Sequence, residues 1–169
     1  MSEEIINRVA NSKLVTLDLE DFYPSGERVV FDIKKWLFED LILKESEFRD
    51  YINQHDWKQY DQKYLALTCS SDAIIPSWAY LLISTKLAGI AKKTVVGDLE
   101  MLETVIFQEI ILSMDVNTFA GKPVILKGCS DKPIPSSAYT LLIERLVPVV
   151  GSLLFGEACS TVPLYKFKK

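Results

Sequence analysis

Three cysteines each stand directly before a serine, and each follows a segment with the composition of a strand. Cys69 opens "CSS", Cys129 opens "CSD" and Cys159 opens "CST". The carboxyl ends of parallel strands meet at one edge of a sheet, where the loops form binding sites. Thiolate sulfur is a soft ligand that suits zinc, copper and iron–sulfur clusters. We therefore predict a metal or cluster site with Cys69, Cys129 and Cys159 as ligands and Glu100 as a fourth ligand.

The serines that follow the cysteines have a predicted role at the same site. Ser70, Ser130 and Ser160 can donate hydrogen bonds to the sulfurs and so tune a bound zinc ion or iron–sulfur cluster. Two alternatives stay open at this point. The cysteines can be buried packing residues, or one of them can be a reactive thiol of low pKa. The sequence leaves open whether the protein is an enzyme.

Two of the cysteines begin a repeated segment. When Ser71 is left out, Cys69–Ser70 and Asp72–Ile83 align with Cys129–Leu142, and nine of the fourteen pairs are identical. At a spacing of 59 residues, Val95–Glu100 parallels Leu154–Cys159, so Glu100 takes the position that Cys159 has in the second copy. The simplest interpretation is an internal duplication of a strand–helix–strand unit.

The elements that must position these residues alternate along the chain. The predicted strands cover residues 14–19, 28–33, 64–68, 94–97, 123–128 and 152–156, and the predicted helices cover 3–10, 46–54, 76–90, 99–114 and 135–147. Strands that alternate with helices indicate an α/β fold with a largely parallel sheet and crossover helices. We predict one domain over residues 1–169, in which 1–60 pack on repeat units 61–100 and 120–159. The tail "YKFKK" is expected to be a solvated chain end.

Composition excludes several classes of protein. Of the 169 residues, 49% are hydrophobic and 25% are charged, as is typical of a globular domain. The net charge of -4 argues against binding nucleic acid. No stretch approaches the roughly 18 apolar residues that a membrane span needs, and no secretory signal is evident. We therefore expect a cytoplasmic protein with reduced thiols. His55, the only histidine, is expected at a helix end on the surface and supports no Ser-His-Asp triad.

Four segments carry a resemblance to a known family. They are "RVANSKLVTLDLEDFYPSGERVVFDIK", "LTCSSDAIIPSWAY", "KGCSDKPIPSSAY" and "GEACSTVPLYK". Over nearly its whole length the chain resembles a bacterial family defined only as a domain of unknown function. Members of that family are often encoded near iron–sulfur assembly components. The resemblance therefore implies an accessory protein with a protein partner in iron–sulfur assembly, and it leaves open a homodimer. The alternative is a non-catalytic interaction module with structural cysteines.

Overall fold

The chain forms two compact units, each with its own sheet. The structure is a computed structural model, which describes residues 14–128, 130–157 and 160–167. Unit 1 consists of Met1–Tyr23 and Phe107–Lys169, and unit 2 of Pro24–Ile106. The α/β class and the mostly parallel strands are confirmed. The described strands form two sheets, where the sequence suggests one.

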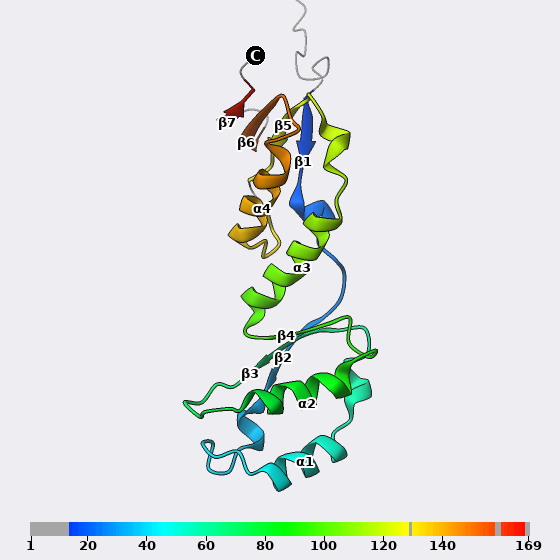
Figure 1. Cartoon of the computed structure of the whole chain (residues 1–169), viewed down its shortest axis with the longest axis vertical. Coiled ribbons are helices and arrows are strands. Elements are labelled where there is room, and N and C mark those ends of the chain that lie inside the picture. The colour runs from blue at the N-terminus through cyan, green and yellow to red at the C-terminus, as the bar shows by residue number, and fades with distance from the viewer. Residues whose placement is uncertain (1–13, 129, 158–159, 168–169) are drawn as a thin grey trace, which may run out of the picture. The chain divides into compact units, whose positions relative to one another are not determined.

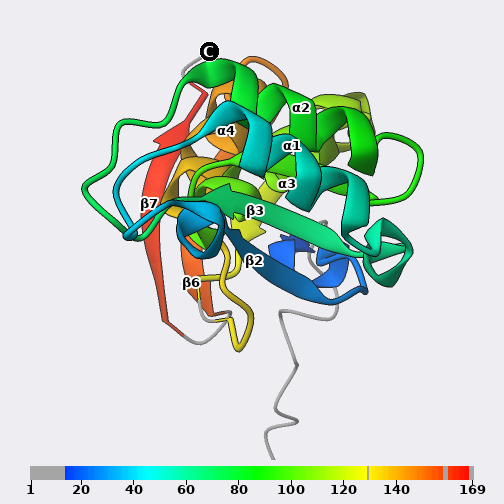
Figure 2. The same ribbon diagram turned by 90° about the horizontal axis from the view of Figure 1, so that it is seen from below.

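Unit 2 is built on a parallel sheet with the strand order β2-β3-β4. The strands are β2 (Arg28–Asp32), β3 (Tyr64–Thr68) and β4 (Lys93–Val96). Helices α1 (Glu45–Gln54) and α2 (Ser77–Leu87) pack on one face of this sheet (Figures 1 and 2). Pro76 is the N-cap of α2, a position where the missing backbone N–H of proline costs no helical hydrogen bond. Its buried side chains join those of α1 and the sheet in one core, made of Phe31, Phe48, Ile52, Leu65, Leu67, Ala79, Ile83 and Leu87.

A buried ion pair ties β2 to the start of helix α3 (Leu99–Ser113). Arg28 Nε lies 2.7 Å from Glu103 Oε1, and the two side chains are only 13% and 6% exposed. Arg28 Nη1 also donates to the carbonyl oxygens of Pro24 and Gly26, each at 2.7 Å. Its guanidinium lies 4.6 Å from the centre of the Tyr64 ring. One arginine therefore holds the first residues of unit 2, its edge strand and α3 together.

The end of α1 lies in an aromatic cluster of unit 2. His55 caps α1 as expected, because its backbone N–H donates to the Tyr51 carbonyl. The imidazole stacks on Tyr60, with ring planes 21° apart, and its Nε2 lies 3.0 Å from the Tyr60 hydroxyl. The rings of Trp36 and Trp57 lie edge-on to it at 5.3 and 4.7 Å. Burial among these rings lowers the pKa of His55, and the nearby Asp56 only partly opposes this.

Unit 1 is built on a mixed sheet with the strand order β1-β5-β6-β7. The strands are β1 (Val15–Leu17), β5 (Pro123–Leu126), β6 (Ser152–Glu157) and β7 (Ser160–Lys166). β1, β5 and β6 are parallel, and β7 is antiparallel to β6. Helix α4 (Ser136–Leu146) and the end of α3 supply the apolar residues that pack on the sheet. This core includes Leu17, Phe107, Ile111, Val124, Leu126, Ala138, Leu142, Leu146 and Leu153.

Four short 3₁₀ helices share one way of starting. They are η1 (Leu19–Phe22), η2 (Ile33–Trp36), η3 (Trp57–Tyr60) and η4 (Val116–Phe119). Each follows an aspartate whose carboxylate accepts the backbone N–H two residues on, namely Asp18, Asp32, Asp56 and Asp115. Such caps satisfy a backbone donor that the short helix leaves free.

Most predicted elements are confirmed, and the main difference is at the end of the chain. Two residues of the expected solvated tail, Tyr165 and Lys166, belong instead to β7, and Tyr165 packs against the core of unit 1. Pro163 argues against a strand in the sequence, but proline is tolerated here because β7 is an edge strand. The helix predicted over 3–10 lies outside the described residues.

The two units have the same order of elements around their parallel strands. In unit 2 these elements are β2 and η2, followed later by η3, β3, α2 and β4. In unit 1 they are β1 and η1, followed later by η4, β5, α4 and β6. Repeat units 61–100 and 120–159 fall in unit 2 and unit 1 respectively. The internal duplication and the single domain over 1–169 stay predictions. In the described part of the chain, no helix is both long and apolar enough to cross a membrane.

Candidate functional site

The strand ends of the two units correspond at a constant spacing. Leu67 in unit 2 aligns with Phe31 and Val96, and Leu126 in unit 1 aligns with Leu17 and Phe155. The pairs Leu67 and Leu126, Val96 and Phe155, and the helix starts Ser77 and Ser136 are each 59 positions apart.

This constant spacing changes which residues correspond between the repeats. The distance from the aligned strand residue to the start of the helix is the same in both units, from Leu67 to Ser77 and from Leu126 to Ser136, so no residue has to be left out. In this register Cys69 corresponds to Gly128, and Ser70 corresponds to Cys129. The cysteine-to-cysteine match seen in the sequence therefore depends on the omission of Ser71. Cys129 itself lies outside the described residues.

The strand ends of unit 2 are joined by an aspartate–serine contact. Asp32 accepts hydrogen bonds from the backbone N–H of Ser70 at 3.0 Å and from its hydroxyl at 2.5 Å. Burial acts to raise the pKa of Asp32, but the hydrogen bonds from Ser70 and from the Lys34 backbone outweigh it and lower the pKa. The sulfur of the half-buried Cys69 lies 3.2 Å from the Ser71 hydroxyl. Burial, together with Cys69 and Asp32, raises the pKa of Tyr80.

The strand ends of unit 1 carry an ion pair at the corresponding place. Lys127 Nζ lies 2.7 Å from Asp18 Oδ2. Burial acts to raise the pKa of Asp18, but the bonds from Lys127 and the Glu20 backbone outweigh it and lower the pKa. The Glu20 carboxylate accepts hydrogen bonds from the Ser130 hydroxyl and the Asp131 backbone N–H, both at 3.3 Å. Asp18 and Glu20 thus hold Lys127, Ser130 and Asp131, which follow β5.

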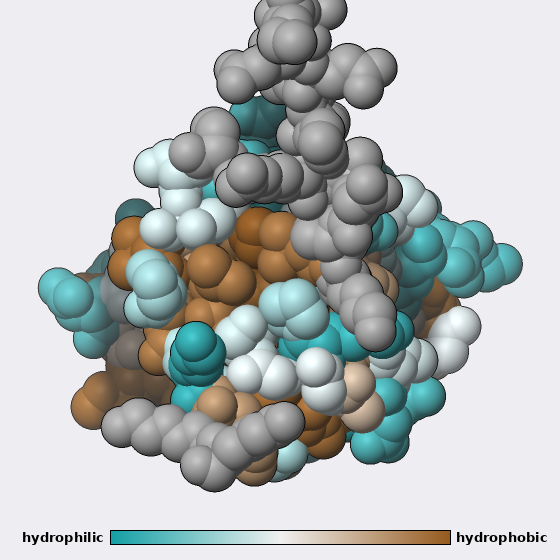
Figure 3. Space-filling view, turned by 90° about the horizontal axis from the view of Figure 1, so that it is seen from above, coloured by the Kyte–Doolittle hydropathy of each residue, from teal (hydrophilic) through white to brown (hydrophobic). Residues whose placement is uncertain are grey.

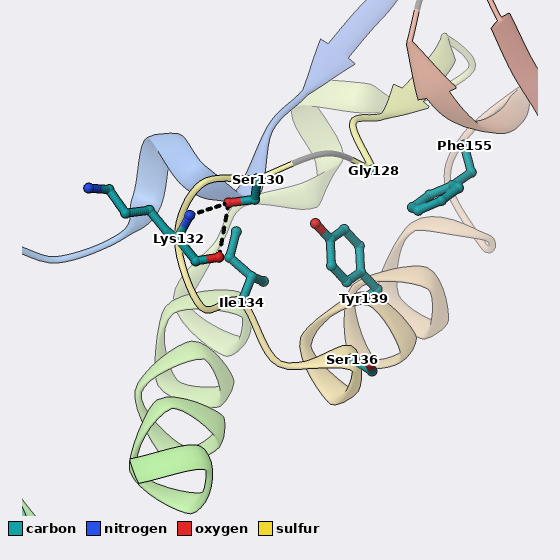
Figure 4. A pocket seen from close by; sticks show the side chains of 7 residues that line it. All are labelled: Gly128, Ser130, Lys132, Ile134, Ser136, Tyr139 and Phe155. Carbon is teal, nitrogen blue, oxygen red and sulfur yellow. Dashed lines mark hydrogen bonds between the residues drawn. The ribbon is translucent and has the colours of Figure 1, made fainter.

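A cavity of about 460 Å³ lies beside these residues in unit 1 (Figure 4). The loop after β5, the first turn of α4 and Phe155 of β6 form its walls, lined by Gly128, Ser130, Lys132, Ile134, Ser136, Tyr139 and Phe155. The rings of Tyr139 and Phe155 meet edge to face, 5.8 Å apart. Figure 4 shows the Tyr139 hydroxyl directed toward the loop of Gly128 and Ser130. The cavity lies at the carboxyl ends of parallel strands, where ligand sites of α/β proteins form.

Comparison with known families identifies the kind of chain this is. A family model described as "Protein of unknown function (DUF2480)" matches residues 3–167. The chain belongs to this family. The resemblance to a domain of unknown function over nearly the whole chain is thereby confirmed. No curated protein and no solved structure matches the chain.

For this DUF2480 chain, the predicted metal ligands fall in different places. Cys69 and Glu100 lie in unit 2, where Glu100 is exposed in the first turn of α3. Cys129 and Cys159 belong to unit 1 and lie outside the described residues. Among the residues that the structure describes, no three His, Cys, Asp or Glu side chains are grouped so that they could hold a metal ion. The four-ligand set stays a prediction.

The three predicted serines have different surroundings. The Ser70 hydroxyl donates a hydrogen bond to the Asp32 carboxylate. The serine hydroxyl that contacts the Cys69 sulfur belongs to Ser71. Ser130 bonds to Glu20 and to the backbone of Lys132, and it lines the cavity. Ser160 is exposed at the start of β7.

Neither of the aspartates that organise these strand ends was predicted from the sequence. Asp18 in "LDL" and Asp32 in "FDI" each stand between apolar residues at the end of a strand, Asp18 directly after β1 and Asp32 as the last residue of β2. This shared pattern is a signal that could have identified both aspartates. Phe155 carried no signal of this kind, because only the pairing of β5 with β6 brings its ring beside Gly128.

Proposed function

We propose that this chain is a thiolate metal- or iron–sulfur-cluster-binding accessory protein, with Cys129 and Cys159 as its ligands. The observation that supports the proposal is the parallel pairing of β5 with β6 in unit 1, with Leu126 aligned with Phe155. Cys129 stands three residues after the end of β5, and Cys159 two residues after the end of β6. Neighbouring parallel strands end at one edge of a sheet, so both cysteines follow the same edge.

The number of thiolates indicates how a site would be completed. Iron–sulfur clusters and structural zinc sites are commonly held by four cysteines. Two cysteines from each of two copies make a set of four, which gives the homodimer a chemical reason. We assign Cys69 a packing role, because its half-buried side chain packs against the core of unit 2 and its sulfur contacts Ser71. We further propose a cytoplasmic role with a partner in iron–sulfur assembly, without nucleic acid.

The test compares matched cysteine variants. Wild-type protein, Cys69→Ser and the double variant Cys129→Ser with Cys159→Ser are purified anaerobically and analysed for metal, sulfide and oligomeric state. We expect equal metal in wild type and Cys69→Ser, and none in the double variant. Equal metal in all three, or none in any, contradicts the proposal. Loss of metal in Cys69→Ser would instead favour the set that includes Cys69.

A second candidate function is a protein-interaction module with structural cysteines. Hydrophobic residues gather on the face shown in Figure 3. On the edge strand β7, Val162 and Leu164 are 61% and 47% exposed. Exposed apolar residues that gather on one face are typical of contact surfaces. This candidate predicts that all three cysteines tolerate serine without loss of partner binding.

A further inference from the structure

The cavity of unit 1 has a composition that unit 2 lacks at the corresponding positions. Gly128, Lys132 and Phe155 correspond to Cys69, Ala73 and Val96 at the spacing of 59. In unit 2 the Cys69 side chain packs against the core, with its sulfur beside Ser71. In unit 1 a glycine stands at that position, so no side chain projects there.

The Phe155 ring, which forms one wall of the cavity, leaves no space for a side chain at position 128. A Cβ atom at position 128 would lie 2.6 Å from Cζ and 2.8 Å from Cε1 of Phe155. Real Cβ atoms do not approach other atoms so closely, so any side chain would displace the ring. The backbone of Gly128 does not have a positive φ. The glycine is therefore needed for space and not for backbone conformation.

The lining determines which ligand the cavity suits. The apolar part comes from Ile134, Tyr139 and Phe155, and two of these are aromatic. The polar part includes Ser136 and Ser130, and the Ser130 hydroxyl is already bonded to Glu20 and to the Lys132 backbone. The Lys132 ammonium is directed away from Tyr139 and Phe155 (Figure 4) and lies 5.9 Å from the Tyr23 ring centre. The charged group of the lining is thus turned away from its aromatic wall.

We infer that this cavity binds a small, uncharged aromatic molecule that carries hydrogen-bonding groups. Aromatic rings prefer edge-to-face or offset contacts with other rings, which Tyr139 and Phe155 offer. Ser136, the first residue of α4, lines the cavity, and its hydroxyl can form a hydrogen bond with a polar substituent of the ligand. The volume of about 460 Å³ falls within the usual range of small-molecule sites. The inference goes beyond metal binding and needs neither Cys129 nor Cys159.

The test uses three probes of similar size. 4-Hydroxybenzamide is aromatic and uncharged, 4-hydroxybenzoate is its charged counterpart, and cyclohexanecarboxamide is not aromatic. Titrations are followed by amide NMR shifts of the residues that line the cavity. We expect saturable shifts with 4-hydroxybenzamide at Gly128, Ser136 and Phe155, and binding at least about threefold weaker for the other two probes. Absence of saturable shifts, or equal binding of all probes, overturns the inference.

Matched variants locate the binding. Gly128→Ala should weaken 4-hydroxybenzamide about tenfold or more, because the Phe155 ring must move. Cys69→Ala alters the corresponding position of unit 2 and should leave the affinity unchanged. Ser136→Ala changes only an exposed hydroxyl, so it stays informative if Gly128→Ala does not fold, and it should weaken binding about threefold. Affinities that are the same in wild type and Ser136→Ala, with Gly128→Ala unchanged or unfolded, overturn the inference.

Discussion

Replacement of Arg28 by methionine should strongly destabilise unit 2. The change leaves the Glu103 carboxylate, 6% exposed, without the guanidinium that lies 2.7 Å away. It also removes the donor to the carbonyls of Pro24 and Gly26 and the cation above the Tyr64 ring. Loss of one partner from a buried ion pair typically costs about 3–5 kcal/mol, because the remaining charge stays buried. We expect the free energy of unfolding to fall by an amount in that range. The hydrogen bond from Arg28 to the Gly26 carbonyl is exposed, so its loss adds little.

Tryptophan fluorescence is the suitable assay for this variant. All three tryptophans of the chain, Trp36, Trp57 and Trp78, lie in unit 2. Their emission during urea unfolding therefore reports the unit that holds the ion pair. The free energy of unfolding is obtained from the midpoint and slope of each curve.

A double variant provides the control. Arg28→Met with Glu103→Leu removes both charges and should recover most of the lost stability, because apolar replacements of buried ion pairs are often nearly neutral. The reasoning is refuted if Arg28→Met costs less than about 1 kcal/mol, the value of an exposed pair. It is also refuted if the double variant is less stable than Arg28→Met.

Three further predictions concern protonation and packing. Because the pKa of His55 is lowered in the folded protein, the unfolded chain binds the proton at a higher pH than the folded chain does. The free energy of unfolding should therefore be at its full value above about pH 6.5 and decrease as the pH falls below it. The urea midpoint of tryptophan emission should therefore drop on acidification, and His55→Gln should reduce this drop. Asp18 has a pKa below 3.8, so Asp18→Asn should be less stable than wild type at neutral pH, with the difference vanishing as pH falls through that lowered pKa; circular dichroism at several pH values measures this. Gly151→Ala would place a Cβ 2.6 Å from the Gly121 carbonyl oxygen, and a cost of about 1–3 kcal/mol in thermal unfolding is expected; an unchanged melting temperature would contradict it.

Local patterns in the sequence were sufficient for the parallel strands and the long helices. The run "YLALT" predicted β3, and its central residues are buried in unit 2. Pro76 and Pro135 marked the starts of α2 and α4. These signals act within a few residues, because hydrophobic periodicity and proline geometry are properties of the local chain. β7 was missed, because its stability comes from pairing with β6 and not from its own composition.

The candidate site depended far more on tertiary structure. The sequence predicted that each cysteine follows a strand. In the alignment of the two repeats, Cys69 was matched with Cys129. The strand pairings and the helix starts of the two units instead correspond at a spacing of 59, which matches Cys69 with Gly128. Sequence similarity counts identical letters, whereas the register is set by backbone hydrogen bonds that join strands far apart in the chain.

The sequence by itself determined the α/β class, the order of strands β1–β6 and helices α1–α4 along the chain, and membership of the DUF2480 family. The tertiary structure alone decided that the strands form two sheets, and that Gly128, Tyr139 and Phe155 line one cavity. The physical reason is the range of the forces involved. Helix and strand formation follow from neighbouring residues, but a cavity exists only where side chains from separate elements leave space between them.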